Sequence, residues 1–370
     1  MKFCIITHVA HTKLEEQYYG YAPYIREMNV WLHYVDEVCI VAPLEKREKT
    51  AIDLVYDSDH IIFKRVPDFN ITGIGAMLKT LLSLPLLFYV VFKAMQQSDH
   101  IHLRCPGNMG LIGCIVQVFF PKKKKTAKYA GNWDLKAAQP WSYRLQKWIL
   151  NNTFLTKNMQ VLVYGDWEGS SVNIKSFFTA TYSETEKQVV RPRDWSNEIK
   201  LLFVGALSEG KRPLYALQLV SELRNRGINA SLRLFGEGAQ REVLEHYIAA
   251  HQLTGFITLE GNQTKETVLE AYKSAHFLIL ASKSEGWPKV VAEAMFWGCV
   301  PLATRVSCVP TMLDGGKRGV LLLLDLEKDV HQLMELLSNT AVLEQMTEKS
   351  VMWSRYYTLE KFESEIKALL

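Results

Sequence analysis

Short apolar runs alternate with longer amphipathic segments along the whole chain. In the first half, the apolar runs that are long enough for strands are residues 2–7, 37–41, 61–66, 101–104, 126–130 and 160–164. Segments with a helical period lie between them, at residues 21–34, 73–95, 108–120 and 141–151. Strands that alternate with helical segments favour a parallel sheet covered by helices.

The same alternation resumes after a polar segment, residues 184–200, which we interpret as a linker. The second set of predicted strands is 201–204, 231–235, 257–260, 277–281, 300–304 and 320–323. The predicted helices of this half are 213–226, 239–251, 265–274 and 327–338, and a last helical pattern covers 358–370. We therefore expect an α/β protein with two doubly wound, Rossmann-like domains, residues 1–185 and 186–354, and a ligand crevice between them.

The clearest strand–turn–helix–strand unit spans residues 277–306. An apolar strand ends in a polar turn, Pro288 opens a helix, and Gly298 ends it before the next strand. Proline at a helix start and glycine just past its end mark both boundaries. The first amides, around Lys289 and Val290, have no partner within the helix, so they offer a site for anionic or hydroxyl-rich ligands.

Two carboxylates accompany that helix start. Glu285 lies in the turn before the helix, and Glu293 lies eight residues further along the chain. Carboxylates accept hydrogen bonds from hydroxyl groups, whereas amides donate to oxygen atoms, so the combination suits a polyol ligand. The alternative is an ordinary α/β unit that carries two surface acids.

A second loop adds positive charge. The predicted strand 201–204 runs into Gly205, and Lys211 and Arg212 come just before Pro213, which begins the next helix. Small residues allow close approach of the backbone, and the two cations can neutralise a diphosphate. A solvated basic turn is the alternative.

A third loop contains Gly236 and Gly238, and it also follows a strand and opens a helix. It is close to the dinucleotide fingerprint Gly-x-Gly-x-x-Gly, with Glu260 about 20 residues further on. Arg241 occupies the third glycine position, where close helix–strand packing needs a residue without a side chain. This mismatch disfavours a nicotinamide-dependent enzyme.

These segments resemble the sugar-nucleotide signature of the retaining GT-B glycosyltransferases of the family-4 (group 1) class. That signature has two glutamates separated by seven residues, with glycine and an aromatic residue after the first. Here it reads Glu285-Gly286-Trp287-Pro288-Lys289-Val290-Val291-Ala292-Glu293. The motifs of the family are found over about residues 201–323. The first domain resembles the family only in its alternation of strands and helices.

The resemblance implies a retaining, metal-independent transferase that moves a sugar from a nucleotide-diphosphate sugar to a glycan or lipid-linked acceptor, and that needs no cofactor. Its catalytic candidates are Lys211 and Arg212, which would hold the diphosphate, and Glu285, which would hold the transferred sugar. Its donor-binding candidates are Gly20, Gly205, Gly236, Gly238, Gly286, Trp287, Pro288, Lys289, Val290 and Glu293. It also implies that a C-terminal helix, residues 355–370, packs on the first domain.

The chain departs from the family pattern at several positions. Ala206 stands where the family usually has an arginine, and Gly20 alone matches a Gly-Gly turn expected after the first strand. The family histidine after a middle strand has no counterpart here. In the segment where that histidine is expected, Asn132 and Asp134 are the acceptor-side candidates, and Arg104 at the end of another strand is a third.

Composition narrows the class of protein. Hydrophobic residues make up 48% and charged residues 22%, as in ordinary globular proteins, and a net charge of +4 does not argue for nucleic acid. Six scattered cysteines without Cys-x-x-Cys pairs fit reduced thiols in a cytoplasmic protein. The N-terminus reads as a first strand, not as a signal peptide. The longest apolar stretch, residues 81–92, is shorter than the roughly 20 residues that span a bilayer.

A basic run follows an apolar segment and precedes several tryptophans. It consists of Lys122, Lys123, Lys124 and Lys125. Cations near aromatic residues suit an anionic membrane face, where each contributes on the order of 1 kcal/mol. We therefore predict peripheral attachment to the inner face of a membrane, where lipid-linked acceptors reside, and the alternative is a solvated basic loop.

Two further functions stay open beside a transferase of cell-surface polysaccharide or glycolipid synthesis. The same fold supports nucleotide-sugar epimerases. The departures from the family pattern also leave room for a catalytically silent, membrane-associated binding protein.

Overall fold

The computed structural model describes residues 1–370 except 51–52, 59 and 68–73, and the side chains of 74–82 are also left undescribed. The chain forms two compact units. One consists of Met1–Phe178 and Phe362–Leu370, and the other of Thr179–Lys361.

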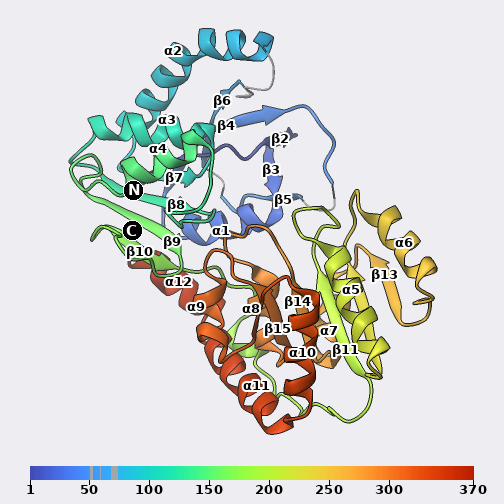
Figure 1. Ribbon diagram of the computed structural model, residues 1–370. Helices are drawn as coiled ribbons and strands as arrows, with labels where there is room; N and C mark the ends of the chain where they lie inside the picture. Colours follow the sequence, from blue (N-terminus) through green and yellow to red (C-terminus); the bar gives the residue numbers. More distant parts are fainter. Residues whose placement is uncertain (51–52, 59, 68–73) are drawn as a thin grey trace. The chain divides into compact units, whose positions relative to one another are not determined.

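The first unit is built on a largely parallel sheet (Figure 1). Its parallel strands are β1 (Lys2–Ile6), β4 (Glu37–Glu45), β6 (Ile61–Val66), β7 (His100–Cys105), β8 (Lys124–Tyr129), β9 (Met159–Tyr164) and β10 (Ile174–Phe177). The strand order is β10-β9-β8-β7-β1-β4, with β6 also paired to β4. The predicted strands of this half are therefore present, and β10 is an addition.

A small antiparallel extension was not predicted. Strands β2 (His11–Leu14) and β3 (Gln17–Tyr21) form a hairpin, and β3 also pairs with β5 (Asp53–Val55). Gly20 pairs with His11 inside this hairpin. The expectation of a turn at Gly20 is therefore wrong, because the residue lies within a strand.

Helices cover both faces of the first sheet. They are α1 (Ala22–Leu32), α2 (Ile74–Gln96), α3 (Asn108–Val116) and α4 (Trp141–Leu150), and a 3₁₀ turn, η1 (Gln117–Phe119), follows α3. Helices α2, α3 and α4 form one layer in Figure 1, and they pack on one another in sequence. Helix α1 covers the opposite face, where Trp31 stacks on Phe3 with ring centroids 5.6 Å apart.

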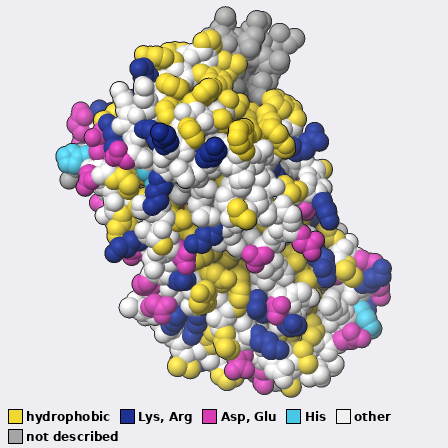
Figure 2. Space-filling view, turned by 90° about the vertical axis from the view of Figure 1, so that its left-hand side faces the viewer, with side chains coloured by type: hydrophobic (Ala, Val, Ile, Leu, Met, Phe, Trp, Pro, Cys, Tyr) yellow, Lys and Arg dark blue, Asp and Glu magenta, His cyan; other side chains and the backbone are white. Residues whose placement is uncertain are grey.

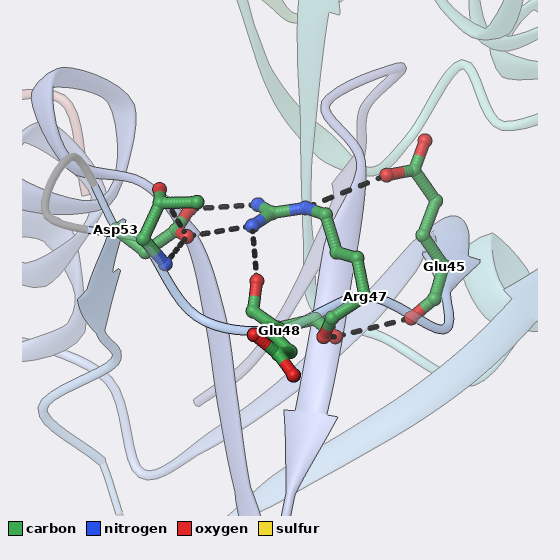
Figure 3. A network of polar contacts seen from close by, with 6 residues as sticks. Glu45, Arg47, Glu48 and Asp53 are labelled. Carbon is green, nitrogen blue, oxygen red and sulfur yellow. Dashed lines mark hydrogen bonds and ion pairs between the residues drawn. The ribbon is translucent and has the colours of Figure 1, made fainter.

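A polar network fixes the connection between β4 and β5 (Figure 3). Arg47 donates two hydrogen bonds to the buried Asp53 carboxylate, at 2.6 and 2.7 Å, and one to the Glu48 carbonyl. Thr50 adds its amide and its hydroxyl to the same carboxylate, both at 2.8 Å. These donors, with Arg47 foremost, hold the pKa of Asp53 far below its usual range.

The second unit has a fully parallel sheet in the order β13-β12-β11-β14-β15-β16. The strands are β11 (Ile199–Val204), β12 (Ala230–Phe235), β13 (Ile257–Gly261), β14 (Phe277–Leu280), β15 (Val300–Thr304) and β16 (Val320–Leu322). The helices are α5 (Pro213–Asn225), α6 (Arg241–Ala250), α7 (Lys265–Ser274), α8 (Lys289–Phe296), α9 (Val309–Met312), α10 (Leu326–Leu337) and α11 (Thr340–Ser354). Two 3₁₀ turns, η2 (Glu184–Glu186) and η3 (Asp314–Gly316), complete it.

The last helix, α12 (Leu359–Lys367), carries the chain into the first unit from Phe362 onward. There the Phe362 ring lies against Phe177 and Phe178, with centroids 5.6 and 5.8 Å apart, and Glu365 pairs with Lys175 at 2.7 Å. No helix among the described residues is long and apolar enough to cross a membrane.

Candidate functional site

The loops singled out from the sequence meet at one edge of the second sheet. Because β11, β12, β14 and β15 are parallel, their carboxyl ends lie at the same edge. The loop after β14 is joined to the loop after β11 by the Lys283 amide, which donates to the Gly210 carbonyl at 2.8 Å. The loop after β15 is joined to the loop after β14 through Ser307, whose hydroxyl donates to the Gly286 carbonyl at 3.1 Å.

The structure brings together the three predicted catalytic residues. Lys211 forms an ion pair with Glu285, and their side chains are 30% and 9% exposed. Arg212 donates to the Ala281 carbonyl at 3.2 Å, and its backbone has a left-handed φ of +49° at the N-cap of α5. The tight turn thus presents two neighbouring cations to the end of β14. A second pair, Lys283 with Glu209, lies more exposed beside the first.

Helix α8 begins beside this pair. Pro288 is its N-cap, and its carbonyl accepts from the Val291 amide at 3.0 Å. No side chain of the described residues caps this helix start. The amides of Lys289 and Val290 lie before that first hydrogen bond of the helix, at its N-terminal end.

Two of the predicted donor-binding glycines, Gly236 and Gly238, have a packing role that the sequence does not reveal. A Cβ atom added to Gly236 would lie 2.0 Å from the Gly205 carbonyl oxygen, and one added to Gly238 would lie 2.5 Å from that of Leu207. The loops are joined further, because the Gly205 amide donates to Phe235 and the Leu207 amide to Glu237, both at 2.9 Å. Glycine is therefore required here to interlock two loops, whatever ligand they bind.

Glu293 lies among hydroxyl groups. Thr181 donates to one carboxylate oxygen at 2.9 Å, and the Tyr272 phenol donates to the other at 3.2 Å. Burial first, and then this carboxylate, raise the pKa of Tyr272 well above its usual range, so the phenol keeps its proton. Sequence reasoning missed both partners, because neither lies in a motif.

The Trp287 ring belongs to an aromatic cluster at the end of α11. It stacks on Trp353 with centroids 5.9 Å apart, and it meets Tyr357 edge to face at 5.8 Å. The Gly286 carbonyl also accepts from the Cys308 thiol at 3.1 Å. These contacts fix the turn from both sides.

The acceptor-side candidates of the first unit are tied into its structure. Arg104 pairs with the buried Glu27 at 3.3 Å. Asn132 accepts from the Asp134 amide at 2.9 Å, and Asp134 accepts from the Lys136 amide at 2.8 Å. Asn132 and Asp134 thus order the loop that follows β8.

His8 follows the first strand of the first unit. The structure finds it exposed at the carboxyl end of β1, with its ring against Gly107, where an added Cβ would lie 2.6 Å from Nδ1. His11, in contrast, is buried, and its Nε2 lies 2.8 Å from the Tyr56 hydroxyl.

The basic run does not form the uniform surface that was predicted. Lys125 is buried, its ammonium donates to Gln117 Oε1 at 2.9 Å, and burial lowers its pKa to about 8. Lys123 donates to the Gln96 carbonyl at 2.7 Å. A membrane face made of all four lysines is therefore wrong, because alternate residues of β8 point to opposite faces of the sheet.

The family of the second unit follows from its sequence. Residues 185–351 match the model of the family described as Glycosyl transferases group 1. The second unit is thus similar to group 1 glycosyltransferase domains over most of its length. An uncharacterized glycosyltransferase of Methanocaldococcus jannaschii is 25% identical over 161 residues, which are 43% of this chain and 44% of that protein. The D-inositol 3-phosphate glycosyltransferase of Corynebacterium jeikeium is 29% identical over 126 residues, 32% of this chain and 30% of that protein. The chain thus spans less than half the length of these curated relatives.

Solved structures match the whole fold around this glycosyltransferase domain. The lipopolysaccharide outer core galactosyltransferase WaaB has a TM-score of 0.69 at 15% identity, over 100% of this chain and 99% of that one. HepE of Anabaena, solved in complex with UDP and glucose, has a TM-score of 0.68 at 13% identity, over 100% and 98%. The prediction of two Rossmann-like domains of the GT-B type is confirmed.

Proposed function

We propose that this protein is a retaining glycosyltransferase of the family-4 class that transfers a sugar from a nucleotide-diphosphate sugar to a glycan or lipid-linked acceptor, without a metal ion. The observation that carries the proposal is the meeting of Lys211, Arg212 and Glu285 beside the start of α8, within a group 1 glycosyltransferase domain.

The charges at this edge suit a sugar diphosphate. Lys211 and Arg212 supply two cations on one tight turn, which match the two negative charges of a diphosphate. Stabilising negative charge on the departing nucleotide is electrostatic catalysis, and it needs no covalent step from the protein. The Glu285 carboxylate would accept hydrogen bonds from hydroxyl groups of the transferred sugar, and the amides at the start of α8 would donate to its oxygen atoms.

Glu293 would bind the ribose. An ionised carboxylate has about four lone-pair sites, so the two hydrogen bonds from Thr181 and Tyr272 leave room for a ribose hydroxyl. Those two donors also fix the orientation of the carboxylate, which favours binding because less side-chain freedom is lost.

The relatives support a transferase over the epimerase and the silent binding protein considered from the sequence, because those named above are described as glycosyltransferases. We take the acceptor to be a glycan or lipid of the cell surface, by analogy with WaaB. On the same view the protein works in the cytoplasm, at the membrane that carries such acceptors. HepE was solved with UDP, so uridine diphosphate sugars are the first donors to test.

A thermal-shift screen of nucleotide sugars, followed by calorimetry, tests the donor half of the proposal. A ligand that binds the folded form stabilises it by mass action, by about 2.7 kcal/mol at a concentration of about 100 Kd. The donor is expected to raise Tm, and Glu293→Gln should weaken its binding by about tenfold because a neutral amide accepts more weakly from the ribose. If no nucleotide sugar binds, or if the variant binds the donor as tightly as the wild type, the corresponding role is refuted.

Two measurements test the finer claims. Nuclear magnetic resonance of the product gives the anomeric configuration, and an inverted anomer would exclude retention. Turnover in the presence of EDTA should equal turnover without it, and a loss of activity that Mg²⁺ or Mn²⁺ restores would refute metal independence.

A further inference from the structure

The first unit carries an unusually one-sided charge. Residues 100–165 contain ten Lys and Arg but one acidic residue, Asp134, so this segment has a net charge of +9 whereas the whole chain has +4. The segment comprises β7, α3, η1, β8, α4 and β9. Lys125, Lys128 and Lys147 are buried, so the positive charge that a partner would meet is that of the remaining cations of the segment.

Helix α4 places aromatic and basic side chains on one outward stripe. Trp141, Arg144 and Trp148 are three, four and seven residues apart, which is the spacing of one helix face. The Trp141 and Trp148 side chains are 64% and 61% exposed, and Arg144 is exposed between them. The opposite face of α4 is buried, so these side chains cannot turn inward.

The stripe continues onto the turn after α4. Phe154 is 75% exposed, and the ammonium of Lys157 lies over its ring at 5.2 Å. Leu135 is 47% exposed, and it lines a shallow pocket of about 540 Å³ together with Arg144 and Trp148. In Figure 2, hydrophobic side chains are exposed among Lys and Arg on the side of the first unit that is viewed. We call Leu135, Trp141, Arg144, Trp148, Phe154 and Lys157 the α4 surface.

We propose that the α4 surface docks on an anionic phospholipid bilayer. Tryptophan rings sit well at a membrane interface because they are amphipathic, and Arg and Lys interact there with lipid phosphates. No acidic residue lies between Lys136 and Tyr164 in the sequence, so the segment itself offers nothing that would repel an anionic surface. Three protruding rings suit a fluid surface, whereas a folded protein partner would need a matching pocket for each of them.

This surface replaces the run of four lysines as the membrane contact. Lys125 is buried, while both tryptophans of α4 are exposed. The inference deepens the proposed function, because a lipid-linked acceptor would then lie in the same bilayer. Docking itself needs no nucleotide sugar, so the two proposals fail separately.

Sedimentation with vesicles tests the α4 surface. The probes are vesicles of phosphatidylcholine alone and of phosphatidylcholine mixed with phosphatidylglycerol, each at low and high NaCl. The wild type is expected to bind only the mixed vesicles, and more weakly at high salt. Binding to neither, or equally to both, would overturn the proposal, and an interface for an acidic protein would then be the better account.

Two variants separate the apolar and ionic contributions. Trp141→Ala with Trp148→Ala should weaken binding to the mixed vesicles by at least about tenfold, because two interfacial rings are lost. Arg144→Glu with Lys157→Glu changes the charge by four units and should weaken it on the order of 100-fold. Arg144→Lys with Lys157→Arg keeps the charge and should bind like the wild type.

Control variants lie in the second unit. Tyr356→Ala removes a ring that is 61% exposed, and Lys349→Glu reverses an exposed charge. Both should bind vesicles like the wild type. Circular dichroism and Tm of each variant should match those of the wild type, since every substituted side chain is exposed. Equal losses in the control and α4 variants, or no loss in either α4 variant, would contradict the inference.

Discussion

The pair of Lys211 and Glu285 gives the sharpest test of the donor site. In the structure the partly exposed ammonium contacts a nearly buried carboxylate. In the proposed reaction the same ammonium faces the diphosphate, so two anions share one cation. Lys211→Ala removes that cation, whereas Glu285→Gln releases it from its present partner.

The expected size of the effect follows from the electrostatics of the site. Two unit charges roughly 4 Å apart interact by about 4 kcal/mol at an effective dielectric constant of about 20. Loss of one group that stabilises developing charge commonly lowers kcat by about 10²–10³. We expect Lys211→Ala to lower kcat/KM by about this factor. The free energy of unfolding should fall by about 1–3 kcal/mol, because the nearly buried Glu285 carboxylate loses its cationic partner.

Glu285→Gln should separate nucleotide binding from transfer. UDP has a diphosphate but no sugar, so it should bind this variant about fivefold more tightly, because Lys211 no longer shares its charge. Transfer should nevertheless slow, because the sugar loses a carboxylate that accepts from its hydroxyls. If the Lys211–Glu285 pair had only a structural role, UDP binding and transfer would not change in opposite directions.

The assay is steady-state release of UDP from the donor found in the screen, with calorimetry for UDP itself. Donor hydrolysis serves where no acceptor is in hand. Lys283→Ala is the matched control, because Lys283 pairs with Glu209 at the same sheet edge but is 47% exposed. It should change kcat/KM by less than about threefold. Wild-type kcat/KM in Lys211→Ala, or an equal loss in Lys283→Ala, would refute the reasoning.

Two further predictions concern stability. Gly236→Ala should lower the free energy of unfolding by about 3–5 kcal/mol in urea titrations, because its Cβ would lie 2.0 Å from the Gly205 carbonyl oxygen. Gly210→Ala, which meets nothing within 4 Å, should stay within about 1 kcal/mol. Asp53→Asn should cost about 2–3 kcal/mol by breaking the bonds to Arg47. Because the folded pKa of Asp53 is depressed, its contribution is present above the unfolded pKa of about 3.9 and is lost as pH falls below it. The variant should therefore lose less stability than the wild type as the pH falls from about 5 to about 3, which is the upper part of that titration, and equal losses would contradict this account.

Local patterns in the sequence determined much of the second unit. Strand β14, helix α8 and strand β15 follow their predicted bounds closely, because apolar runs, Pro288 and Gly298 act within a few residues of one another. The parallel order then places the carboxyl ends of β11 and β14 at one edge. That is why Lys211 and Glu285, 74 residues apart, were predicted at the same site.

Sequence patterns were least informative about strands whose pairing partners lie far apart in the chain. Strands β2, β3 and β5 are short and partly polar, and they become strands because β3 pairs with both β2 and β5 while β2 also pairs with β4. Their hydrogen bonds depend on which segments the fold brings together. The turn expected at Gly20 was wrong for this reason.

Only the tertiary structure decided which polar side chains have partners. Residues 122–125 form a basic run in the sequence, yet burial of Lys125 depends on Gln117 of a different element. The motif predicted Glu293 as a donor-binding residue, whereas no motif predicted its hydrogen-bond partners Thr181 and Tyr272. Periodicity and helix boundaries are encoded by neighbours along the chain, so the sequence determines the elements and their order. Hydrogen bonds between elements depend on distances in space, and these are set only when the sheets and helices pack.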